Sequence, residues 1–206
     1  MVFLACLSAG MGELYAQRIS IGAEAGVPLT ESFDTGFIYR GTFVPATSRY
    51  TVGPALELRL NGRFSAEFSA LYQPFSFQES GIIGVPSSRK TTGGLWQFPV
   101  LLRYSFFEGP IRPFVPVGPS FQAAAKITAS DMTVVDPTPV ISHPEPTRRA
   151  IAGVAAGGGL QFSIGRLRIS PELRYTRWGV ENFDFTQTNH VGTKLNQFQV
   201  LVAVMF

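Results

Sequence analysis

The chain has 206 residues, of which 13% are aromatic and only 15% charged, whereas soluble domains carry about 25% charged residues. This length suits one domain, and the low charge disfavours an ordinary soluble protein. The net charge of +3 is spread along the chain without a basic run, which argues against nucleic-acid binding.

Residues 1–17 resemble an export signal. A short apolar run covers 2–9 and is followed by small residues and the stretch Leu14-Tyr15-Ala16-Gln17, in which Leu14 rather than a small residue lies three before Ala16. No Lys or Arg precedes the run, which leaves open a true start codon upstream. We therefore expect a signal peptide over 1–17 and one mature domain over 18–206.

Cys6 is the only cysteine and lies within the leader, so the mature domain can form neither a disulfide nor a cysteine metal cluster. A lipid anchor on Cys6 is disfavoured because the residue is too close to Met1 to follow a full export segment. The nearest later candidate, 150–165, contains the triplet Gly157-Gly158-Gly159 and is too short for a membrane helix. A membrane would therefore be crossed by strands.

Alternation of apolar and polar residues recurs in segments close to the roughly 9 to 11 residues that a tilted membrane strand needs. In 50–60, for example, the even positions are apolar, whereas the odd positions include Glu57 and Arg59. The eight predicted strands cover 18–27, 50–60, 64–73, 95–106, 112–122, 149–164, 167–177 and 194–206. Three prolines leave the phase of the fifth strand ambiguous.

The connections between these segments alternate in length. Three are tight turns, at 61–63, 108–111 and 165–166. Four are long, at 28–49, 76–92, 126–148 and 178–193. This alternation is typical of an all-β, eight-stranded antiparallel up-and-down transmembrane barrel with short periplasmic turns and long extracellular loops.

A soluble lipocalin-like barrel is the alternative, with its apolar face inside and its charges in water. The polar face here consists mostly of Ser, Gly, Gln and Thr with isolated charges, and large aromatics lie near the strand ends. Both features favour a membrane barrel with aromatic girdles, in which the apolar face contacts lipid and the charges are enclosed.

Two carboxylates are predicted to face each other inside such a barrel. The phase of the alternation across 61–63 sets Glu57 opposite Glu67, an unfavourable pair unless cations lie nearby. Arg59 and Arg103 share the inward phase and are the available cations. The predicted interior charge network comprises Glu24, Glu57, Arg59, Glu67, Arg103, Glu172 and Arg174.

Small residues are predicted opposite long charged ones in another hairpin. A two-residue turn at 165–166 sets Gly159 opposite Glu172 and Gly157 opposite Arg174. The glycines would leave room for these charged side chains in a narrow lumen. A simple bend or bulge at the glycines remains an equal alternative.

The final strand alternates apolar residues and ends in an aromatic. Its outward residues are Phe198, Val200, Val202, Val204 and Phe206. This ending, together with the leader and the strand count, resembles the OmpA/OmpX-type small barrels and the wider outer membrane protein beta-barrel domain group. The resemblance implies a bacterial outer-membrane location, contact with outer-membrane lipids, and periplasmic chaperones and the barrel-assembly machinery as partners, with the final strand as the assembly signal.

The favoured function is a non-enzymatic, monomeric barrel whose loops bind an unidentified extracellular ligand for adhesion or envelope integrity. No catalytic, cofactor-binding or metal-binding residues are predicted, and the paired carboxylates are not taken as a glycosidase site because a filled barrel has no room for a sugar. One alternative is a lipid A-modifying enzyme with His143 or His190 as base. The other is a narrow, porin-like passive pore.

Overall fold

The computed structural model describes residues 19–30, 41–45, 50–81, 87–125, 127–133, 140–142, 149–180 and 193–206. The predicted signal peptide lies outside these ranges. The strands are β1 (Ile19–Pro28), β2 (Gly41–Pro45), β3 (Thr51–Arg59), β4 (Phe64–Ser69), β5 (Leu71–Gly81), β6 (Ser87–Ser105), β7 (Ile111–Ala124), β8 (Thr128–Thr133), β9 (Val140–Ser142), β10 (Ala150–Ile164), β11 (Leu167–Trp178) and β12 (Asn196–Met205). In the described part of the chain no helix is long and apolar enough to cross a membrane.

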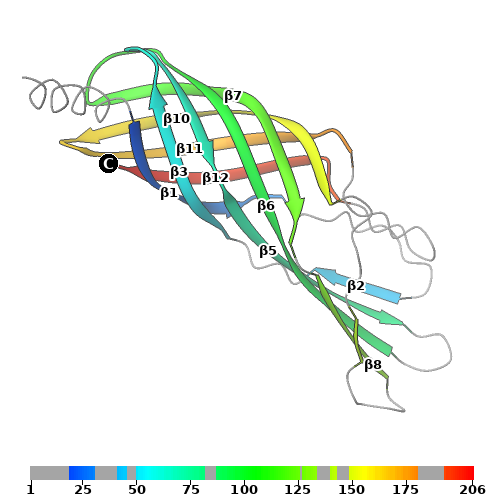
Figure 1. The fold of residues 1–206 in the computed structure, drawn as a ribbon. Helices are drawn as coiled ribbons and strands as arrows, with labels where there is room; N and C mark the ends of the chain where they lie inside the picture. The colour runs from blue at the N-terminus through cyan, green and yellow to red at the C-terminus, as the bar shows by residue number, and fades with distance from the viewer. Residues whose placement is uncertain are drawn as a thin grey trace, which may run out of the picture.

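The sheet closes on itself because β1 pairs with both β12 and β3. β4 and β5 act as one strand of the barrel. Their register against β3 is the same, since Ala55 pairs with Ser69 and Val52 with Tyr72. With β4 and β5 counted as one, β1, β3, β6, β7, β10, β11 and β12 complete an antiparallel barrel of eight strands (Figure 1). The predicted fold class is confirmed.

The charged side chains of the predicted network except Arg59 are buried inside the barrel, and most aliphatic side chains of the wall are exposed, as predicted, although Leu71, Leu95, Leu101 and Leu201 are buried. Glu24 and Arg174 are each 1% exposed, whereas Val154 is 59% exposed. The structure also assigns the phase of the fifth strand, β7, where Gln122 is buried and Phe121 is exposed. A barrel with this arrangement presents an apolar surface to lipid and keeps its ionic groups away from it.

The two predicted hairpin registers are confirmed. Glu57 pairs with Glu67 across β3 and β4, and Gly157 pairs with Arg174 across β10 and β11. In the first turn the Asn61 side-chain oxygen accepts hydrogen bonds from two following backbone N–H groups. Gly165 adopts a φ of 62° in the second turn, a conformation that glycine adopts without steric cost.

Aromatic side chains cluster near both ends of the barrel wall. Phe64 and Tyr104 lie 5.0 Å apart between ring centroids at the end that carries the short turns, here called the turn end. Tyr175 and Phe198 lie 4.8 Å apart toward the other end, here called the loop end. Such paired bands match the interfaces of a bilayer, where amphipathic rings are enriched.

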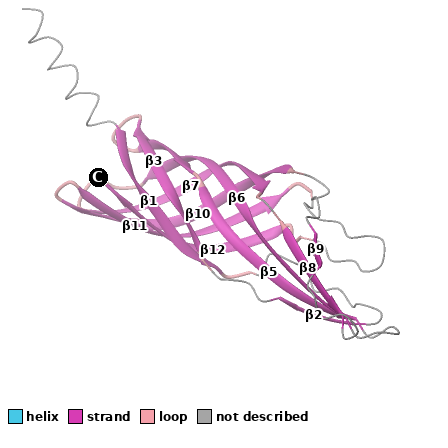
Figure 2. Cartoon of the chain, turned by 60° about the horizontal axis from the view of Figure 1, so that its bottom comes forward, coloured by secondary structure: helices cyan, strands magenta, loops and turns pink. Residues whose placement is uncertain are grey.

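The long connections differ from the prediction because they contain strands. The predicted loop 76–92 is largely a continuation of the β5–β6 hairpin, and β6 has 19 residues, about twice what a membrane strand needs. β2 pairs with the end of β5, β8 with the start of β6, and β9 with β8. These five segments form an antiparallel sheet that projects beyond the loop end (Figures 1 and 2), called the extramembrane sheet below.

Candidate functional site

The centre of the barrel holds a layer of short ion pairs around Arg174. Its Nε lies 2.6 Å from Glu172 Oε1, and its Nη2 lies 2.9 Å from Glu24 Oε1 and 3.0 Å from Glu67 Oε1. The Ser69 hydroxyl donates to the other Glu24 oxygen at 2.7 Å. Three strands, β1, β4 and β11, are thereby linked across the lumen, and the opposite charges stabilise one another where water is scarce.

Arg103 bridges the carboxylates with a different geometry. Its guanidinium carbon lies 3.5 Å from the centroid of the Phe114 ring. Its nitrogens lie 3.5 Å from Glu67, 3.9 Å from Glu57 and 3.9 Å from Glu172. The Arg103 side chain is therefore held by a cation–π contact and by longer-range attraction to three carboxylates.

Arg168 belongs to this network, although the sequence analysis did not include it. Its Nη1 lies 2.7 Å from Glu57 Oε2. Arg168 has the same position in the alternation of β11 as Glu172 and Arg174, so the sequence pattern already indicated that its side chain faces the interior. With Arg168 included, three buried arginines face four buried carboxylates.

Arg59 lies apart from the other predicted network residues. It is half-buried toward the turn end and forms no ion pair with any residue that the structure describes. The six other predicted residues are ion-paired with one another. Arg59 was expected to neutralise the paired carboxylates. Glu57 is instead ion-paired with Arg168 and Arg103, and Arg168 makes the closer contact.

Four glutamines form a neutral layer inside the barrel, between the buried charges and the loop end. Gln97 Nε2 donates to Gln73 at 3.0 Å and to Gln197 at 3.1 Å, and Gln199 Nε2 donates to Gln73 at 3.4 Å. The Trp178 indole N–H donates to Gln197 at 3.2 Å. Side chains that interlock in this way across the lumen leave little room for an aqueous path.

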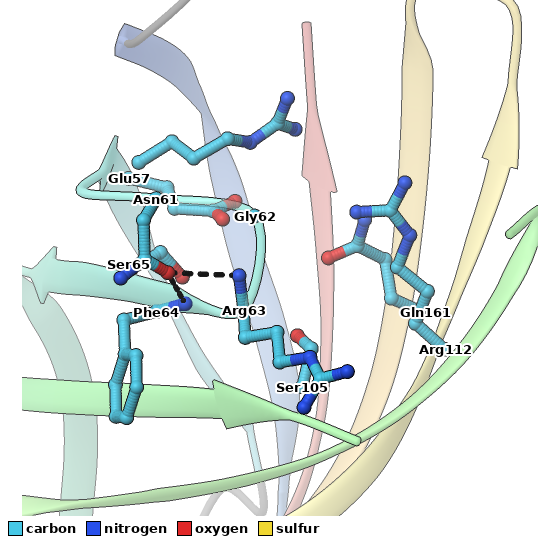
Figure 3. A pocket seen from close by; sticks show the side chains of 10 residues that line it. Glu57, Asn61, Gly62, Arg63, Phe64, Ser65, Ser105, Arg112 and Gln161 are labelled. Atoms are coloured by element: carbon cyan, nitrogen blue, oxygen red, sulfur yellow. Dashed lines mark hydrogen bonds between the residues drawn. The ribbon is translucent and has the colours of Figure 1, made fainter. Parts of the chain in front are cut away.

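A pocket opens at the turn end. Its lining residues are Glu57, Arg59, Asn61, Gly62, Arg63, Phe64, Ser65, Ser105, Arg112 and Gln161. Figure 3 shows Arg63 in the β3–β4 turn and Arg112 on β7, on opposite sides of this pocket. Three of the lining side chains are arginines, which gives the turn-end pocket a positive character.

The predicted assembly residues lie on the outer face of β12, except Phe206, which directly follows the strand. Phe198, Val200, Val202 and Phe206 are exposed, and Val204 is half-buried. β12 pairs with β1 on one side and β11 on the other, so the final strand also closes the barrel.

The two histidines considered as catalytic bases, His143 and His190, lie outside the described residues. Among the residues that are described, no group of three or more His, Cys, Asp or Glu side chains is arranged to hold a metal ion. The buried carboxylates are engaged with arginines rather than directed at a substrate-sized space.

Solved structures similar to this chain are small outer-membrane barrels, at low identity. OprG from Pseudomonas aeruginosa is 10% identical, with 91% of this chain and 94% of that chain covered and a TM-score of 0.46. Neisserial surface protein A is 13% identical, with 91% and 97% covered and a TM-score of 0.39. Ail of Yersinia pestis is 9% identical in one structure, with 92% and 99% covered and a TM-score of 0.36. No curated protein matches the chain.

Residues 15–185 match the family described as "Outer membrane protein beta-barrel domain". The match covers most of the chain and includes strands from β1 to β11 of the closed barrel. The apolar outer wall and the enclosed charges agree with that description. The chain therefore belongs to the outer membrane protein beta-barrel domain family and is a protein of the bacterial outer membrane.

Proposed function

We propose that this barrel is a non-enzymatic scaffold that displays the extramembrane sheet at the cell surface for adhesion or binding. The observation that carries the proposal is the extension of β5 and β6 well beyond the length that a bilayer requires. Added strands on both sides, β2 and β8 with β9, make the extension a sheet rather than a lone hairpin. Residues on a sheet are held in a more fixed arrangement than residues on a free loop, which favours binding.

The central hairpin of the extramembrane sheet, made by the distal parts of β5 and β6, is mostly polar. The part of β6 that belongs to this sheet, 87–92, reads Ser-Ser-Arg-Lys-Thr-Thr. The part of β5 that pairs with it contains Gln78 and Glu79. Gln78 Nε2 donates to Ser88 Oγ at 2.9 Å across the two strands. The outer wall of the barrel below is aliphatic and aromatic instead, so the boundary between lipid and water falls near the base of this sheet.

The edges of the extramembrane sheet offer a mode of recognition. β2 and β9 are its outermost strands in the described part of the chain. An extended segment of a partner can add to such an edge through main-chain hydrogen bonds. We infer an extracellular ligand that binds this sheet, outer-membrane lipids around the barrel, and chaperones and the assembly machinery during biogenesis. We also infer that the barrel is a monomer.

The interior favours a scaffold over an open pore or an enzyme. Buried ion pairs and the glutamine layer fill the lumen, and an eight-stranded barrel is only wide enough for its side chains. The acids inside lie at 2.6 Å (Glu172) and 2.9 Å (Glu24) from nitrogens of Arg174, so these carboxylates are engaged in contacts between strands rather than directed at a substrate.

A truncation tests the proposed function. Ser76 and Thr92 are cross-strand partners, so residues 77–91 can be replaced by an Asn-Gly turn that closes the shortened hairpin. Bacteria that produce the full or the truncated chain are compared for adhesion to epithelial monolayers, with surface amounts equalised. We expect the truncated barrel to remain heat-modifiable on gels and adhesion to be lost.

Equal adhesion by the two strains would contradict the role of the extramembrane sheet. Mass spectrometry of lipid A from the same cells tests the enzyme alternative. We expect no change in acylation, and a new acylation state that disappears in His190→Ala or His143→Ala would overturn the non-enzymatic assignment.

A further inference from the structure

We propose that the turn-end pocket is a binding site for a phosphate group, either free in the periplasm or carried by a phospholipid of the inner leaflet. This site lies at the opposite end of the barrel from the extramembrane sheet and is independent of the proposed surface function. The argument rests on three arginines that converge from three different parts of the chain. They are Arg59 at the end of β3, Arg63 in the β3–β4 turn and Arg112 at the start of β7.

The backbone holds these arginines in place. The Asn61 side-chain oxygen accepts hydrogen bonds from the N–H groups of Arg63 at 2.9 Å and Phe64 at 2.7 Å, which orders the turn. Arg112 donates from Nε to the Gly109 carbonyl at 2.8 Å, which leaves both of its terminal nitrogens for other partners. Figure 3 shows Arg63 and Arg112 approaching the pocket from opposite walls.

None of the three arginines forms an ion pair with a carboxylate in the described part of the chain. Glu57, the acid in the pocket lining, is already 2.7 Å from Arg168. The exposed Glu108 carboxylate lies close to Gly62, across the turn, and is the one acid near the rim among the described residues. The three arginines thus outnumber the acids beside them and carry no ion pair within the described residues, and a cleft with low-dielectric walls concentrates such a positive field on an anion.

Neutral donors complete the lining. Ser65, Ser105 and Gln161 are buried at the base of the pocket. Gln161 is the cross-strand partner of Arg112, so an amide and a guanidinium lie side by side on the inner wall. Guanidinium groups bind phosphate oxygens in pairs of hydrogen bonds, and hydroxyl and amide groups satisfy the oxygens that remain.

The size of the pocket limits what can enter. The cavity volume is only ≈ 10 Å³, about enough for one water-sized group, and the pocket is partly open to solvent. A phosphate oxygen can therefore enter while the body of the ligand stays outside the barrel. This geometry suits a terminal phosphate or a lipid headgroup at the periplasmic rim, and it does not suit a solute that passes through the lumen.

The test uses the full barrel, refolded in a maltoside detergent that carries no phosphate. Binding of inorganic phosphate is measured by titration calorimetry for the parent chain, Arg63→Gln and Arg112→Gln. The control is Arg166→Gln, which removes an exposed arginine at the same end but outside the pocket. Native mass spectrometry with phosphatidylglycerol or phosphatidylcholine of equal chain length forms a second arm. Heat modifiability verifies that each variant is folded.

We expect the Kd for phosphate to rise about tenfold in Arg63→Gln and in Arg112→Gln, the loss of one charge-assisted contact, and to be unchanged in Arg166→Gln. If inorganic phosphate does not bind but the phosphatidylglycerol adduct is lost in the two pocket variants alone, the site takes the lipid-borne group. An equal loss of phosphate or lipid binding in Arg166→Gln would overturn the proposal, because it would indicate a diffuse electrostatic attraction of anions to this end of the barrel. Binding of neither probe would also overturn it.

Discussion

Glu57 and Glu67 lie directly opposite each other on the inner wall of the barrel, and each is closely bound by a different arginine. Glu57 Oε2 is 2.7 Å from Arg168 Nη1, and Glu67 Oε1 is 3.0 Å from Arg174 Nη2. Arg103 lies near both carboxylates, at 3.9 Å and 3.5 Å. The repulsion expected between two enclosed acids is therefore offset by three nearby cations, Arg103, Arg168 and Arg174.

Arg103→Leu should destabilise the barrel by about 3 to 5 kcal/mol, because the substitution leaves enclosed carboxylates with one cation fewer. Urea unfolding of the barrel in lipid vesicles, followed by tryptophan fluorescence, measures the loss. Arg166→Leu, at an exposed turn position, is the control and should leave the midpoint in place. An unchanged midpoint in Arg103→Leu would show that the network adds nothing to stability.

Glu67→Gln in the Arg103→Leu background should recover part of the lost stability. The second substitution removes one of the acids that Arg103 faces at 3.5 Å while keeping the size of the side chain. The two changes together should cost less than the sum of their separate costs, and this coupling is what a double-mutant cycle measures. Strict additivity would mean that Arg103 and Glu67 do not interact.

Gly159→Ala should destabilise the barrel by about 1 to 3 kcal/mol, since the added methyl overpacks the interior. A Cβ at this position would lie 2.4 Å from the Phe114 ring and 2.4 Å from the Pro171 carbonyl oxygen. Gly158→Ala is the matched control, because a Cβ there meets nothing closer than 3.9 Å. If both variants unfold at the same urea concentration, the packing of the Phe114 ring does not require a glycine at position 159.

Planar-bilayer recording should show no steady open-channel steps for the parent barrel, because the glutamine layer and the ion pairs fill the lumen. Gln97→Ala/Gln197→Ala removes two of the interlocked amides and should raise the conductance. Gln78→Ala, which changes an exposed glutamine of the extramembrane sheet, should not. Large steady steps in the parent chain would favour the pore alternative.

Phe206→Ala tests the predicted assembly signal. Phe206 is 71% exposed, and its backbone N–H donates to Ile21 at 3.1 Å, a bond that alanine retains. The stability of the refolded barrel should therefore change little, while the heat-modifiable amount in outer membranes should fall several-fold. Phe107→Ala, at another exposed aromatic, is the control. An equal fall in Phe107→Ala would assign the loss to the aromatic girdle rather than to the terminal residue.

Local patterns in the sequence determined the positions of the barrel strands and the face on which each side chain lies. Residues on a strand alternate between the two faces, so the inward positions of Glu57 and Arg103 could be inferred from neighbours alone. Turn length then set the pairing of Glu57 with Glu67 and of Gly157 with Arg174, since a hairpin of known turn length has one register.

The structure of the long connections was not predictable in this way. The segments β2, β8 and β9 lie in stretches whose composition is that of loops. They become strands because β5 and β6 extend past the barrel and present backbone edges to them. The phase of β7 was hidden by its prolines and follows from its register with β6 and β10.

The sequence by itself determined an all-β membrane barrel, the course of its eight barrel strands and the enclosure of its charges. Only the tertiary structure decided which charges meet: Arg174 with Glu24, Arg168 rather than Arg59 with Glu57, and Arg103 against Phe114. Alternation and turns act between neighbours along the chain. Contacts across the lumen depend on how the closed sheet tilts and staggers its strands, which brings together residues more than a hundred positions apart.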